Sequence, residues 1–99
     1  MKKILLVCNA GMSTSMLVKK MQDAAAEAGI EAEISALPIT EATDKMTDYD
    51  ILLLGPQIRF QKDNLSKQAD GKIPVEAIDM QAYGTMNGKA VLDFALSKI

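Results

Sequence analysis

Short apolar runs alternate along this chain with segments of helical periodicity. Residues 3–7 and 50–54 are dominated by continuous runs of strand length, a pattern typical of strands buried on both faces. Residues 31–36 alternate between polar and apolar positions, which predicts a strand nearer the edge of a sheet, ended by Pro38. A short fourth strand is predicted over residues 75–78, after Pro74.

The segments between these strands carry helical patterns. After Ser15, apolar residues fall on one face as far as about Ala28, and Gly29 is placed to end that helix. We also expect a short helix over residues 40–46 with Thr40 as its N-cap. Further helices are predicted over residues 58–70 and 89–98, and residues 79–84 are expected to form a turn-rich connection.

Alternation of strands and helices predicts an α/β fold, a four-stranded parallel open sheet with helices on both faces. Residues 1–99 are expected to form a single domain, because a chain of this length has room for one core. In such sheets the working loops follow the carboxyl ends of the strands. Residues 8–15, 55–58 and 79–84 are therefore expected at one edge.

Charge argues against nucleic-acid binding, and hydropathy argues against insertion into a membrane. The chain has 11 basic and 13 acidic residues, a net charge of -2, and no basic stripe, so we expect no nucleic acid as a partner. Its unbroken apolar runs fall far short of the ~20 residues that a membrane-spanning helix needs, and polar residues interrupt any signal-peptide pattern. We therefore expect a cytoplasmic protein.

Two residue types restrict the chemistry. A single cysteine excludes an internal disulfide, a CxxC redox pair and a cysteine-rich zinc site. The absence of histidine excludes a Ser-His-Asp triad, a Cys-His pair and imidazole metal ligands. We expect no metal or cofactor, and any nucleophile must be activated by something other than an imidazole of this chain.

Cys8 is the candidate nucleophile, because it ends the first buried strand and precedes a loop that leads into a helix. The candidate phosphoryl-binding loop comprises Asn9, Ala10, Gly11, Met12, Ser13, Thr14 and Ser15. Backbone N–H groups of such a loop form an anion-binding nest, to which the helix N-terminus adds positive potential. The same groups favour a thiolate and would lower the pKa of Cys8 from about 8.5. A small buried cysteine is the alternative interpretation.

The loop is similar to the tyrosine-phosphatase signature, in which a cysteine is followed by five residues, an arginine and a serine. Cys8 and Ser15 match it, but Thr14 stands in place of the arginine. A guanidinium fork stabilises the transition state of phosphoryl transfer, so its loss argues against efficient phosphatase turnover. A nest without that arginine suits a carrier of phosphocysteine, and a low-molecular-weight cysteine phosphatase remains the alternative.

Residues 7–18, with the Cys-x-x-Gly-Met-Ser-Thr-Ser loop, and the Leu-Gly-Pro-Gln-Ile segment at 54–58 resemble a known family. It is the IIB component of the bacterial phosphoenolpyruvate-dependent sugar phosphotransferase system, in the lactose/cellobiose/chitobiose group and closest to the cellobiose/chitobiose type. The resemblance implies a four-stranded parallel sheet, similar to that of low-molecular-weight tyrosine phosphatases.

The resemblance also implies that Cys8 accepts a phosphoryl group from a phosphohistidine on a IIA partner. Cys8 would then pass it to a disaccharide as the sugar crosses the membrane through a IIC partner, which binds the sugar. The protein would be a phosphotransferase, transiently at the inner face of the membrane. A regulatory domain of the same fold, which senses phosphorylation without passing it on, is a further alternative.

Gln57 and Tyr83 lie on two of the loops expected near Cys8, and Arg59 follows one of them closely. Gln57 and Tyr83 are possible secondary contacts of the phosphoryl group or of a partner, although a solvated turn residue and a packing ring are the favoured interpretations. Arg59 could supply the missing guanidinium from another loop, but we favour a surface position. Met12 and Met16 flank the Cys8 loop and could form an apolar collar where partners dock, but Met16 could as easily be a core residue.

Overall fold

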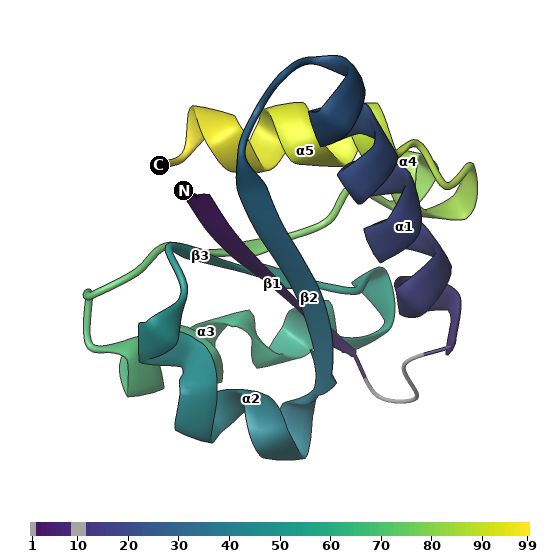
Figure 1. The fold of residues 1–99 in the computed structure, drawn as a ribbon. Helices are drawn as coiled ribbons and strands as arrows, with labels where there is room; N and C mark the ends of the chain where they lie inside the picture. Colours follow the sequence, from purple (N-terminus) through teal and green to yellow (C-terminus); the bar gives the residue numbers. More distant parts are fainter. Residues whose placement is uncertain (1, 9–11) are drawn as a thin grey trace.

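The protein is a three-layer α/β structure in which helices cover both faces of one sheet (Figure 1). A computed structural model describes residues 2–8 and 12–99, and for Cys8, residues 12–14 and Gln57 it describes the backbone alone. The strands are β1 (Lys2–Cys8), β2 (Ala32–Pro38), β3 (Ile51–Leu54) and β4 (Val75–Ala77). All pair in parallel in the order β2-β1-β3-β4, which confirms the predicted fold class.

The helices separate into two layers. On one face lie α1 (Met12–Glu27), α4 (Met80–Gly84) and α5 (Gly88–Ser97). On the other lie α2 (Ile39–Lys45) with the 3-10 helix η1 (Met46–Asp48), and the 3-10 helix η2 (Pro56–Gln61) with α3 (Lys62–Ala69). Figure 1 shows the sheet between these layers, with β2 at one edge.

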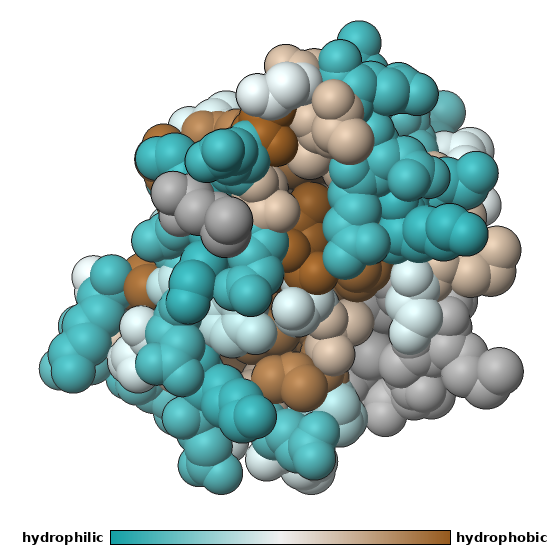
Figure 2. Space-filling model, in the orientation of Figure 1, coloured by the Kyte–Doolittle hydropathy of each residue, from teal (hydrophilic) through white to brown (hydrophobic). Residues whose placement is uncertain are grey.

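The two central strands supply side chains to both layers, which explains their continuous apolar runs. Ile4 and Leu6 of β1 pack beneath α1 and α5, whereas Leu5 and Val7 pack against the opposite helices. Ile51 to Leu54 of β3 alternate in the same way, and all of these side chains are fully buried. Viewed towards the β2 edge, hydrophilic residues cover most of the surface and apolar residues appear in a band between them (Figure 2).

The structure corrects the expected helix boundaries at three places. Helix α2 begins at Ile39 with Pro38 as its N-cap and no capping side chain, so the expected Thr40 cap is wrong. The extended ψ of 153° at Pro38 lets the helix start directly after β2. The single helix expected over residues 58–70 is two, the 3-10 helix η2 and the α-helix α3, and η2 itself is kinked at Ile58, whose dihedral angles are non-helical.

The third correction concerns residues 79–84, where a turn-rich connection was expected. Residues 80–84 form helix α4 instead, and Asp79 is its N-cap: the Asp79 carboxylate accepts a hydrogen bond from the Ala82 amide at 3.0 Å. An aspartate two residues after a strand was the signal for this helix. No helix among residues 12–99 is long and apolar enough to cross a bilayer.

Candidate functional site

Cys8 is the last residue of β1, a central strand with a neighbour on each side. In the parallel register Cys8 pairs with Pro38 of β2, and Val7 pairs with Leu54 of β3. The Gly55 amide donates a hydrogen bond of 3.0 Å to the Val7 carbonyl, which continues the ladder one residue beyond β3. The Cys8 backbone is therefore held between the carboxyl ends of two strands, at the edge where ligand sites of open α/β sheets occur.

Helix α1 starts four residues after Cys8 and has no acidic residue in its first turn. Ser13 and Thr14 belong to this turn by their backbone, and the Ser15 side chain is exposed. The first amides of a helix lack intrahelical acceptors and carry partial positive charge, and no carboxylate of this turn competes for them. Asn9, Ala10 and Gly11 of the expected phosphoryl-binding loop lie outside the described residues.

A pocket of about 290 Å³ lies on the same edge of the sheet. Its lining comes from the segments that follow β3 and β4: Pro56, Arg59, Met80, Tyr83 and Gly84. The Ile78 amide donates a hydrogen bond of 2.8 Å to the Leu54 carbonyl, so the two segments leave the sheet side by side. The register thus brings the carboxyl ends of β1, β3 and β4, where the three expected loops begin, to one edge, as predicted.

The two secondary candidates differ in how the structure places them. Tyr83 lies on α4 with only 8% of its surface exposed, where it packs with the core beneath α1 and α5 and lines the edge pocket. This placement favours the packing interpretation of the ring. Gln57 belongs to η2 by its backbone, and its side chain lies outside the described part of the chain. Contact of either residue with a phosphoryl group stays a prediction.

Sequence reasoning did not anticipate the pairing of Arg59 with Met80. Arg59 is exposed, and its guanidinium Nη1 donates to the Met80 sulfur at 3.7 Å across the mouth of the pocket. The two residues are 21 positions apart on different segments, so no local pattern predicts their contact. That Arg59 is the chain's single arginine was the only sequence signal for it.

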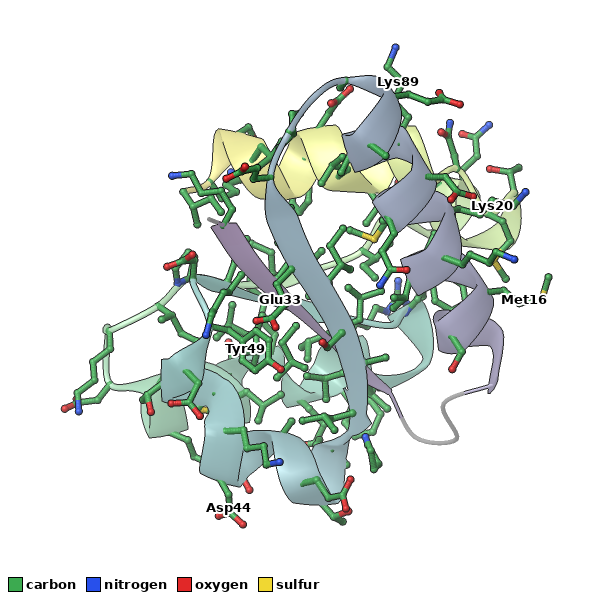
Figure 3. All side chains as sticks on the ribbon, in the orientation of Figure 1. Met16, Lys20, Glu33, Asp44, Tyr49 and Lys89 are labelled. Atoms are coloured by element: carbon green, nitrogen blue, oxygen red, sulfur yellow. The ribbon has the colours of Figure 1, made fainter. Side chains whose placement is uncertain are left out.

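Large apolar side chains are exposed on the segments around this edge. Met16 is exposed rather than buried in the core, and its side chain points away from the protein near the start of α1 (Figure 3). Phe60 of η2 and Met80 of α4 are exposed as well, and neither was singled out from the sequence. Among the side chains that the structure describes, which do not include that of Cys8, no cluster of acidic residues could hold a metal ion.

Solved structures of similar shape include IIB proteins. A lactose-specific IIB component domain of the phosphotransferase system from Streptococcus pneumoniae superposes with a TM-score of 0.88, covering 98% of this chain and 96% of that one, at 20% identity, which supports the fold alone. A cellobiose-specific IIB component from Borrelia burgdorferi superposes with a TM-score of 0.81 at 44% identity, covering 98% of this chain and 90% of that one.

Sequence relatives lead to the same family. The oligo-beta-mannoside-specific EIIB component of Bacillus subtilis is 51% identical over 98 residues, covering 98% of this chain and 95% of the relative. The cellobiose-specific EIIB component of Lactococcus lactis is 44% identical over 97 residues, covering 92% of this chain and 90% of the relative. Residues 3–94 match the model of the PTS system, lactose/cellobiose-specific IIB subunit family. The chain belongs to that family.

Proposed function

We propose that this protein accepts a phosphoryl group from a IIA phosphohistidine onto Cys8 and transfers it to a disaccharide of the cellobiose, chitobiose or lactose class during uptake through a IIC transporter. The observation that carries the proposal is the position of Cys8, in a member of the IIB family, at the carboxyl end of a central strand and directly before the loop into α1. This is the geometry in which backbone amides and a helix N-terminus bind phosphate.

The chemistry consists of two displacements at phosphorus. In the first, the thiolate sulfur of Cys8 forms the S–P bond as the P–N bond breaks, and the imidazole of the IIA protein leaves. In the second, a sugar hydroxyl releases its proton to water as its oxygen forms the O–P bond, the S–P bond breaks and the thiolate is restored. The imidazole belongs to the partner, which accounts for a chain without histidine.

The phosphoryl group on Cys8 would be held by residues 9–15, through loop amides and the hydroxyls of Ser13, Thr14 and Ser15. The α1 N-terminus supports this assignment, because a helix of sixteen residues directs its positive end towards the segment that follows Cys8. With Thr14 in place of an arginine, the loop binds the ground state about as well as the transition state. Uniform binding of this kind preserves phosphocysteine instead of hastening its hydrolysis.

Membership of the family supports the proposed sugar class and cellular location. Two relatives are named for β-linked sugars, oligo-beta-mannoside and cellobiose, which supports a β-linked disaccharide as the substrate class that we propose. The protein would work in the cytoplasm as a single phosphocarrier domain and visit the inner face of the membrane only where it meets the IIC partner.

The first prediction is that Cys8→Ser abolishes phosphorylation. The unmodified protein, incubated with a phosphorylated IIA protein of this family, should gain the mass of one phosphoryl group and become resistant to alkylation by iodoacetamide. Ser66→Ala, which changes an exposed hydroxyl on α3, is the matched control and should behave like the unmodified protein. Phosphorylation of Cys8→Ser to the same extent would contradict the proposal.

A second measurement separates the carrier from the phosphatase alternative. The unmodified protein should show negligible turnover of p-nitrophenyl phosphate, because the loop lacks the guanidinium fork of cysteine phosphatases. Phosphocysteine should persist long enough to be isolated. Brisk hydrolysis of the aryl phosphate that Cys8→Ser eliminates would favour the phosphatase instead.

A further inference from the structure

The edge pocket combines an apolar lining with one cation at its mouth. Pro56, Met80, Tyr83 and Gly84 supply the apolar part, and the Arg59 guanidinium lies against the Met80 sulfur at 3.7 Å. The contact with Met80 orients the guanidinium. Because a thioether is a weak hydrogen-bond acceptor, little free energy is lost when a stronger acceptor replaces the sulfur. The Met80 contact therefore orients the Arg59 guanidinium without neutralising its positive charge.

Neighbouring charges leave Arg59 available to an external anion. In the part of the chain that the structure describes, no carboxylate lies within ion-pair distance of Arg59, whereas the nearby Lys62 pairs with Glu76 at 3.1 Å. Asp79 is the one acidic residue of the segment 78–88, and its carboxylate caps α4 through the Ala82 amide. Segments 8–18 and 55–61 contain no acidic residue. The segments that follow β1, β3 and β4 at this edge therefore carry a single carboxylate, which is engaged in capping α4.

The three segments at this edge carry exposed residues of the types that are common in protein-binding surfaces. Met16, Phe60 and Met80 are exposed by 60%, 73% and 63%, and they lie on the three segments that follow β1, β3 and β4. Arginine, methionine and aromatic residues are enriched in protein interfaces, where an apolar anchor enters a pocket and a charged group fixes its orientation. An adaptable methionine at the pocket mouth suits such an anchor.

We infer that Arg59 and the edge pocket select the phosphoryl-donor protein, by accepting a surface that presents a carboxylate beside an apolar side chain. The apolar side chain enters the pocket, and the carboxylate replaces the Met80 sulfur as the acceptor of the Arg59 N–H groups. The inference rests on the proposed function, because the partner is the phosphorylated IIA protein. Arg59 is thus a specificity-determining residue of the docking step rather than of the chemical step.

The test measures transfer from a phosphorylated IIA protein of this family to variants of Arg59. R59Q should raise the KM for the donor about tenfold, since interface arginines of this kind are among the residues that dominate binding, and R59E should raise it further. For both variants kcat should stay near that of the unmodified protein, and R59K should retain part of the affinity. The effect should shrink in high salt.

Two controls separate docking from other effects. Lys72→Glu makes the same change of charge as R59E in the exposed turn that precedes β4, at the opposite edge of the sheet, and should leave the KM unchanged. The rate at which the neutral reagent iodoacetamide alkylates Cys8 should be equal in R59E and the unmodified protein, because Arg59 acts on the partner and not on the thiol.

The remaining outcomes distinguish the inference from the proposed function. If the unmodified protein accepts no phosphoryl group from any IIA protein, the proposed function fails and the inference with it. If R59E is phosphorylated with an unchanged KM, only the inference is overturned. A fall in kcat at constant KM would also overturn it, by assigning the guanidinium to the transferring phosphoryl group. Replacing the paired IIA carboxylate by lysine should restore transfer to R59E.

Discussion

The two helical layers are built differently, although the sheet between them contributes equally apolar side chains to each. Above one face, the sixteen-residue α1 packs directly against the ten-residue α5. Beneath the other face lie the seven-residue α2, the eight-residue α3 and two 3-10 helices. Side-chain N-caps are present on α4 and α5 of the first layer, through Asp79 and Asn87, whereas α2 and α3 have none.

The layer that contains α1 and α5 is also the layer that adjoins the segment after Cys8, where we expect phosphoryl transfer. Helix α1 continues directly from the segment after Cys8, so whatever fixes α1 also fixes the N-terminal amides proposed to hold the phosphoryl group. The two helices lie very close at Gly88, where a Cβ atom would clash with the Lys20 carbonyl carbon and would lie 2.6 Å from the Met21 nitrogen. Backbone meets backbone there, and neither helix can yield by rotating a side chain.

Gly88→Ala should lower stability more than any other substitution in either layer that we propose. The added methyl requires α1 and α5 to separate, and overpacking of this kind costs about 1–3 kcal/mol. The gain in helix propensity offsets only part of that cost. Chemical denaturation of the variant measures the free energy of unfolding, and the rate of Cys8 alkylation by iodoacetamide reports whether the start of α1 has moved.

Gly84→Ala is the matched control for Gly88→Ala. Gly84 ends α4 with no atom within 4 Å of its would-be Cβ and without a positive φ, so the change should stay within about 0.5 kcal/mol of the unmodified protein. Equal stability of the two variants would show that the α1–α5 contact does not limit the first layer, and the contrast between the layers would lose its main support.

The second comparison concerns the caps. The Asn87 side-chain oxygen accepts a hydrogen bond of 3.2 Å from the Ala90 amide at the start of α5. Asn87→Ala should therefore lower the free energy of unfolding by about 1 kcal/mol, the usual cost of losing an N-cap. Asn87→Asp keeps an accepting oxygen and should retain most of the stability. An equal loss in both variants would contradict the capping interpretation.

The sequence predicted the parts of the fold whose signal is local and strong. Continuous apolar runs at residues 3–7 and 50–54 identified β1 and β3, because strands buried on both faces need no polar alternation. The end of the first helix was also anticipated: Gly29 follows α1 closely and adopts the positive φ of 69° that glycine tolerates. The grouping of the loops at the carboxyl edge of the sheet followed from the parallel arrangement of the strands alone.

The parts that sequence reasoning missed depend on short elements or on distant contacts. Helix α4 has only five residues and contains a glycine, so its periodicity is too brief to detect, and the Asp79 cap was the one usable signal. The division of residues 56–69 into η2 and α3 depends on backbone geometry, including a kink within η2 at Ile58, whose side chain is buried against the sheet. The contact between Arg59 and Met80 arises only when β3 and β4 pair.

The smallest expected effect concerns an ion pair of the second layer. Lys62 at the start of α3 and Glu76 of β4 are 3.1 Å apart, with side chains 45% and 23% exposed. Solvent screens such a pair, and exposed ion pairs contribute about 0–1 kcal/mol. Glu76→Gln should therefore cost no more than about 0.5 kcal/mol of stability, which high salt should reduce further.

Glu33→Gln is the control, because it breaks the longer and more exposed Lys3–Glu33 pair of 3.7 Å and should cost still less. A double-mutant cycle with Lys62→Met measures the coupling energy of the Lys62–Glu76 pair. A coupling energy above about 1 kcal/mol would mean that the second layer depends on charge pairing, whereas the first layer depends on close helix packing and on N-caps.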